Sequence, residues 1–191
     1  MKRGRKNTWF RESLDYVAES RQFVYIAITL FILSGVIGFV FADKFDFIEK
    51  ILKMLVDRTE GLNTFELITF IFFNNAQSSF LAIIFGIVLG IAPAVNAIAN
   101  GTVIGYVLSK VYYFSGASEF WRLLPHGIFE LPAIFISLGL GMKLGMCIFA
   151  KDARKEFVRR LVLSLKSFLT IILPLLIIAA IIEGFLITAR L

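Results

Sequence analysis

The residues with the clearest chemical potential are His126 and Glu130, which lie four positions apart in a segment apolar enough to occupy a membrane. His126 is the only histidine in the chain. On a helix, residues four apart share a face, about one turn from each other. Pro125 and Pro132 flank the pair. Ionisable groups inside a membrane are costly and usually functional, so this pair is the first candidate for a site.

Three hypotheses account for the pair. In the first, Glu130 accepts hydrogen bonds from His126 or from nearby backbone groups and fixes a broken helix. In the second, the pair lines a polar cavity for transport or ion passage, as broken helices do in many transporters. The asparagines in other apolar segments would contribute to that cavity, and these are Asn74, Asn75, Asn96 and Asn100. Such amides also serve as hydrogen-bonding contacts between helices.

The third hypothesis is a metal-dependent or hydrolytic site. His126 and Glu130 resemble half of a zinc site, and Glu66 or Glu183 could add an oxygen ligand. However, HExxH is absent, no second histidine can complete the site, and no GxSxG nucleophile motif occurs. We therefore expect no enzyme activity, no catalytic residue, no metal and no cofactor.

The composition indicates an integral membrane protein. Hydrophobic residues make up 58% of the 191 residues, charged residues only 18%, and the mean hydropathy is +0.82. Soluble domains average roughly 45–50% apolar and about 25% charged residues. The basic residues cluster in residues 2–6 and 151–160, as expected for cytoplasmic ends of membrane helices. No nucleic-acid-binding motif accompanies them.

The charge-free stretches predict an all-α bundle of five spans in a single membrane domain, with a cytoplasmic N-terminus and an outer C-terminus. Residues 1–22 would form a basic tail and an interfacial helix, and residues 44–60 an outer amphipathic helix. Pro93 is the expected reversal point between the second and third spans. Pro125 and Pro132 predict a broken or re-entrant helix over residues 123–133. The expected spans are residues 23–42, 65–91, 94–113, 123–150 and 161–188, with a basic cytoplasmic loop at 151–160.

Small residues recur at helical spacing in three of these spans. Such stripes let helices approach closely in lipid, and we expect them to support a homo-oligomer. The glycines that would make these contacts are Gly86, Gly90, Gly101, Gly105, Gly141 and Gly145.

The segment from Leu124 to Ala133, with its His126-Gly127 and Glu130-Leu131-Pro132 elements, resembles the stage II sporulation protein M family. Asn74-Asn75 and Asn100-Gly101 support the resemblance, which covers nearly the whole chain. It implies a five-span membrane protein. The family member after which it is named is a membrane scaffold for cell-wall-degrading partners during forespore engulfment. The resemblance marks His126, Gly127, Glu130 and Pro132 as motif positions without assigning them a role.

We therefore expect a non-enzymatic membrane scaffold or membrane-remodelling component in the cell membrane. Its partners would be the lipid bilayer, other copies of the chain, and membrane or cell-envelope proteins. The alternative is a small-solute or ion transporter built around Glu130 and His126. The two differ in one structural feature, because a transporter needs these polar residues to line a shared cavity, whereas a scaffold needs only a packed polar contact.

Overall fold

The computed structural model describes residues 8–116, 118, 120 and 124–188, without the side chains of Thr8 and residues 124–126. The expected basic tail at 1–7 and the start of the expected fourth span at 123 lie outside this range. Every regular element in the described residues is helical, which confirms the all-α prediction. The elements are α1 (Thr8–Glu19), α2 (Arg21–Val40), η1 (Ala42–Lys44), α3 (Phe47–Thr59), α4 (Thr64–Phe85), α5 (Ile91–Ser115), α6 (Leu124–Gly145), η3 (Met146–Phe149), α7 (Ala153–Ser167), η4 (Phe168–Ile172) and α8 (Leu173–Thr188).

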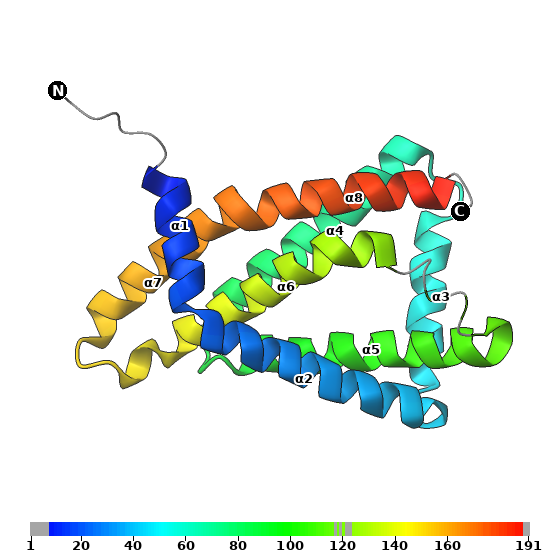
Figure 1. Ribbon diagram of the computed structural model, residues 1–191, viewed down its shortest axis with the longest axis horizontal. Helices are drawn as coiled ribbons and strands as arrows, with labels where there is room; N and C mark the ends of the chain where they lie inside the picture. The colour runs from blue at the N-terminus through cyan, green and yellow to red at the C-terminus, as the bar shows by residue number, and fades with distance from the viewer. Residues whose placement is uncertain (1–7, 117, 119, 121–123, 189–191) are drawn as a thin grey trace.

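Five helices are long and apolar enough to cross a membrane, namely α2, α4, α5, α6 with η3, and the composite of α7, η4 and α8. They run roughly along the long axis of the molecule, with α1 lying across one end and α3 across the other (Figure 1). We call these the α1 end and the α3 end. Helices that lie across the ends of a bundle in this way suit the two membrane interfaces.

Helix α6 is the centre of the bundle. It packs against α2, α4, α5 and α8. In its most apolar window 61% of the residues are buried, compared with 22–33% in the other four spans. The residues of α6 are therefore the ones best placed to meet side chains from several helices at once.

The glycine stripes act inside this bundle. A Cβ atom at Gly105 would overlap the Gly35 carbonyl of α2, and one at Gly101 would overlap the Phe31 carbonyl. Gly86 and Gly141 are in equally close contact between α4 and α6. These glycine surfaces are occupied by contacts within one chain. The homo-oligomer therefore stays a prediction, and it would have to form through another surface.

The reversal between α4 and α5 corrects a second expectation. Helix α4 ends at Phe85, and the chain turns over residues 86–90, not at Pro93. Gly90 adopts φ +68°, a left-handed conformation that glycine reaches without a steric penalty. Pro93 is the third residue of α5. The first turn of a helix tolerates proline because its N–H groups have no partner within the helix.

The predicted break around 123–133 is also wrong for the described residues. Helix α6 continues through Pro132 to Gly145. It changes direction in its first half, as shown in Figure 1. Proline removes one backbone hydrogen bond, which bends a helix without interrupting it when neighbouring helices support both sides. The segment is a bent helix and not a re-entrant loop.

The expected basic loop at 151–160 is largely helical. Only a short turn precedes α7, which begins at Ala153 after Asp152 accepts a hydrogen bond from the Lys155 amide at 3.1 Å. A π-helical turn, η4, joins α7 to α8 directly before Pro174. Such a turn absorbs the backbone mismatch that a proline creates, so the two helices form one long element.

Candidate functional site

Two adjoining cavities occupy the middle of the bundle and its α3 end. The outer cavity, of about 340 Å³, is lined by α3, α4, α6 and α8. The inner chamber, of about 90 Å³, is lined by α4, α5 and α6. Asn74, Asn75 and Glu130 line both spaces, so the two cavities meet at these three side chains. Glu130 is the one among them that carries a formal charge.

The cavity linings are as follows. The outer cavity is bounded by Leu55, Val56, Thr59, Leu67, Phe70, Ile71, Asn74, Asn75, Glu130, Glu183 and Ile187. The inner chamber is bounded by Asn74, Asn75, Ser78, Ser79, Ala82, Asn96, Asn100, Glu130, Ile134, Ser137 and Leu138.

Helical spacing brings these side chains to common faces. On α4, Asn75 and Ser79 are four residues apart, and on α5 so are Asn96 and Asn100. Glu130 and Ser137 lie two turns apart on α6. Because α6 packs against both α4 and α5, the three polar faces converge. Asn75 lies about halfway along α4, which at 1.5 Å per residue places the convergence near the middle of a bilayer.

The start of α4 is fixed by its own sequence. Asn63 Oδ1 accepts a hydrogen bond from the Glu66 amide at 3.1 Å, and a Glu66 carboxylate oxygen accepts one from the Asn63 amide at 2.9 Å. This capping box satisfies two N–H groups that the helix leaves open. Glu66 therefore caps α4 and does not line either cavity, which removes it from the ligands suggested for a metal.

Hydrogen bonds in the chamber direct its donors towards other chain atoms. Asn100 Nδ2 donates to Asn96 Oδ1 at 2.6 Å and to the Asn96 carbonyl at 3.0 Å. Ser137 Oγ donates to the Ile134 carbonyl at 2.8 Å. The Asn75 side chain interacts with the Glu130 carboxylate. Asn100 and Ser137 both line the chamber, and these bonds do not use Asn100 Oδ1 or the lone pairs of Ser137 Oγ.

Ser79 is the exception among these polar groups. Its side chain lines the chamber and is only 2% exposed, yet its Oγ has no hydrogen-bond partner in the part of the chain that the structure describes. A buried hydroxyl without a partner costs free energy, roughly 1–3 kcal/mol. A molecule or ion in the chamber would satisfy it.

Two carboxylates face the outer cavity, Glu130 from α6 and Glu183 from α8, and they interact electrostatically. Two like charges in a low-dielectric space attract a cation or a proton. Within the described residues, no three His, Cys, Asp or Glu side chains converge as they would to hold a metal ion.

The structure brings together five of the residues predicted for a polar site, Glu130 and the four asparagines. The side chain of His126 lies outside the described residues. Gly127 and Pro132 line neither cavity. Among the described residues, a Cβ atom at Gly127 would meet only Leu131, at 3.6 Å, so its backbone is in close contact with no other described helix.

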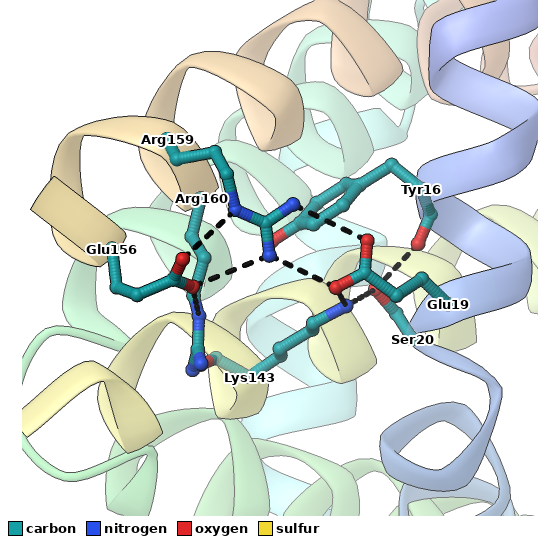
Figure 2. A network of polar contacts seen from close by, with 7 residues as sticks. All are labelled: Tyr16, Glu19, Ser20, Lys143, Glu156, Arg159 and Arg160. Carbon is teal, nitrogen blue, oxygen red and sulfur yellow. Dashed lines mark hydrogen bonds and ion pairs between the residues drawn. The ribbon is translucent and has the colours of Figure 1, made fainter. Parts of the chain in front are cut away.

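A second polar cluster at the α1 end was not predicted. Lys143 of α6 is only 5% exposed. Its ammonium group lies 2.9 Å from Glu19 Oε1, 3.2 Å from Ser20 Oγ and 4.4 Å from the centre of the Tyr16 ring (Figure 2). The signal in the sequence is that Lys143 is the only charged residue between Glu130 and Lys151. An isolated charge within an apolar span predicts a buried partner.

Two arginines of α7 complete this cluster (Figure 2). Arg159 pairs with Glu19 at 2.9 Å and with Glu156 at 3.2 Å. Arg160 donates to the Lys143 carbonyl at 2.7 Å. The Arg159 hydrogen bonds, and then those of Lys143, hold the pKa of the Glu19 carboxyl at about 2, well below its usual 4.5. The cluster thus ties α1, α6 and α7 together at the α1 end.

Comparisons with known proteins identify the family. The family model described as Stage II sporulation protein M matches residues 27–187, which include all five apolar spans almost entirely. No curated protein and no solved structure gave a significant match. The chain is a helical membrane protein with five candidate spans that belongs to the Stage II sporulation protein M family.

Proposed function

We propose that this protein moves a small polar or cationic solute across the cell membrane, with the outer cavity and Glu130 as its binding site. The observation that carries the proposal is that Glu130 lines both cavities together with Asn74 and Asn75. A packed scaffold would instead have sealed this carboxylate among apolar side chains. The volume of the outer cavity, about 340 Å³, suits a small molecule.

The two ends of the polar space differ, as alternating access requires. Two residues that line the chamber, Ala82 and Leu138, belong to a buried apolar cluster with Ala97 and Met142. The contact of Gly86 with Gly141 lies closer to the α1 end. We therefore propose that this conformation is the one closed towards the α1 end.

The charge distribution supports an orientation. Residues 1–21 and 143–166 together carry 13 Lys and Arg against 5 Asp and Glu, whereas the rest of the chain carries 7 against 9. By the positive-inside rule we propose that the α1 end is cytoplasmic. The outer cavity would then accept solute from outside the cell, and the N-terminus would be inside and the C-terminus outside.

Cysteine accessibility tests for a water-filled route. In a Cys147→Ser background, Asn75→Cys should react with a membrane-impermeant thiol reagent added to intact cells. Phe73→Cys is the matched control, since this neighbouring α4 side chain is 63% exposed on the outer surface of the helix bundle and would face lipid. Equal and negligible labelling of both variants would contradict a route from outside.

Transport itself is measurable in proteoliposomes. We expect osmotic swelling in a panel of polyols, amino acids and small amines to be faster than in empty vesicles for at least one solute. Glu130→Gln keeps the shape of the side chain and should abolish that difference. Swelling indistinguishable from that of empty vesicles for every solute would refute the proposal.

A non-enzymatic scaffold or membrane-remodelling role is the second candidate, and α3 favours it. Helix α3 is amphipathic and lies across its end of the bundle (Figure 1). Phe47, Ile51 and Met54 are each more than half exposed. Such a face would insert into the membrane interface or contact another envelope protein or a second copy of the chain. Failure of Asn75→Cys to react from outside would favour this candidate.

A further inference from the structure

We infer that the inner chamber is a binding site for a monovalent cation the size of Na⁺, with the Glu130 carboxylate as its counter-charge. The inference rests on the proposed function for its role in transport, but its test does not require transport. Glu130 would then connect a cation in the chamber to a solute in the outer cavity.

The charge of the chamber favours a cation. Among the residues that line it, Glu130 is the only one with a formal charge, and none is Lys, Arg or His. Glu183, which interacts electrostatically with Glu130, lines the outer cavity and not the chamber. A carboxylate near the middle of a membrane is costly unless it is paired with a cation. A single negative charge is balanced by one monovalent cation, whereas a divalent metal would leave an excess charge in a low-dielectric space.

The oxygen atoms of the chamber suit a hard cation. Ser137 Oγ donates its hydrogen to the Ile134 carbonyl, which leaves its lone pairs free. Asn100 uses its amide nitrogen as a donor to Asn96, which leaves Asn100 Oδ1 as an acceptor. Carbonyl, hydroxyl and carboxylate oxygens are the ligands that hard cations prefer.

Ser79 provides an independent observation. Its Oγ is buried, lines the chamber and has no hydrogen-bond partner among the described residues. A bound cation would accept a lone pair of this oxygen directly, or through one of its water molecules. The chamber therefore contains a polar atom whose requirement is met only when something occupies the space.

The size of the chamber selects the ligand. Its volume of about 90 Å³ is roughly a quarter of that of the outer cavity. It has room for an ion with a few water molecules, but not for a metabolite. The arrangement thus divides the two roles, with the ion in the inner chamber, the solute in the outer cavity and Glu130 at their boundary.

The test is a direct binding measurement on the full chain in detergent. We expect saturable binding of ²²Na⁺ that excess unlabelled Na⁺ displaces, and a Na⁺-dependent rise in melting temperature at constant ionic strength with choline as the replacement. Ser79→Ala should weaken Na⁺ binding by about tenfold or more, and Glu130→Gln should abolish it. Ser34→Ala is the matched control, because Ser34 is equally buried but lies on α2 away from the chamber.

The outcomes separate the two proposals. Absence of ²²Na⁺ binding to the folded wild-type protein, or equal stabilisation by choline, would overturn the cation site. The same conclusion would follow if Ser34→Ala weakened binding as much as Ser79→Ala. If Ser79→Ala does not fold, Ser137→Ala takes its place with the same expected loss. Solute uptake without Na⁺ binding would refute only this inference, whereas Na⁺ binding without any uptake would refute only the proposed function.

Discussion

Replacing Glu19 by Gln should destabilise the protein by removing the counter-charge of a buried lysine. Lys143 is 5% exposed, and its ammonium group lies 2.9 Å from the Glu19 carboxylate. Glutamine keeps the size of the side chain and one accepting oxygen, so the packing around Tyr16 is preserved. What the variant loses is the negative charge, which leaves Lys143 charged in an apolar span.

The magnitude follows from the exposure of the two groups. Removing one partner of a fully buried ion pair costs about 3–5 kcal/mol. A pKa of about 2 in place of 4.5 for Glu19 corresponds to about 3 kcal/mol, at roughly 1.4 kcal/mol per unit. However, the Glu19 side chain is 47% exposed, so solvent screens the interaction. We therefore expect a loss of about 1–2 kcal/mol, or a fall in melting temperature of roughly 3–8 °C.

Lys143→Met provides the contrast. It removes the buried charge, and Glu19 keeps Arg159 as a partner at 2.9 Å. Replacing a buried charge by an apolar side chain of similar volume is often neutral. We expect Lys143→Met to change the melting temperature little, and to restore most of the loss when combined with Glu19→Gln. Such non-additivity is the mark of a direct pairwise interaction.

The contacts of Glu19 with Arg159, and then with Lys143, predict a dependence on pH. The pKa of Glu19 is lowered in the folded protein, so its contribution to stability is complete above pH 4.5 and is lost as the pH falls from about 4.5 towards about 2. Melting temperatures in detergent between pH 7 and pH 3 measure this loss, which should be smaller in Glu19→Gln. Asp15→Asn, at an exposed carboxylate on the same helix, is the control. If Asp15→Asn and Glu19→Gln had the same effect, the assigned role of the ion pair would be refuted.

Two further predictions concern packing and topology. Gly86→Ala should sharply lower the yield of monodisperse protein, because its Cβ would overlap the Gly141 carbonyl. Gly127→Ala is the control and should be tolerated. Equal yields of the two variants would contradict the close contact of α4 with α6. In the cysteine-free background, Lys53→Cys should react with an impermeant reagent in intact cells, and Arg154→Cys only after permeabilisation. The reverse pattern would invert the proposed orientation.

The sequence was sufficient to predict the helices and their polar faces, because both depend on the local spacing of residues. Charge-free length defines a span, and Asn96 and Asn100 share a face wherever α5 is placed. It was not sufficient to show that these faces meet Glu130 in one space, since that depends on the packing order of α4, α5 and α6. The pairing of Lys143 with Glu19, 124 positions apart, is equally non-local, although the isolated lysine indicated that some partner must exist.

The errors at the turns have a common physical origin. Pro93 and Pro132 were interpreted as points where the chain turns or breaks, because proline lacks an N–H group and is rare within helices. Pro93 instead lies in a first turn, where that group is not needed, and Pro132 lies in a helix supported on several sides. The actual reversal depends on the left-handed conformation of Gly90. The sequence does not single out this residue, because glycine also occurs at many positions where it serves only close packing.

Helix α6 links the polar cavities to the α1 end, and under the proposed function this arrangement would set the energetic cost of opening a route at that end. Glu130, Gly141 and Lys143 lie in order along this one helix, at the two cavities, at the close contact with α4 and in the ion-pair cluster. A route towards the α1 end requires α6 to separate from α4 beyond the chamber. Any such movement of α6 must either carry α1 and α7 with it or break the Lys143–Glu19 pair and the Arg160 hydrogen bond. In the proposed transport cycle, the cluster at the α1 end would therefore form part of the energy barrier between the closed state and an open one, in addition to holding α1 in place.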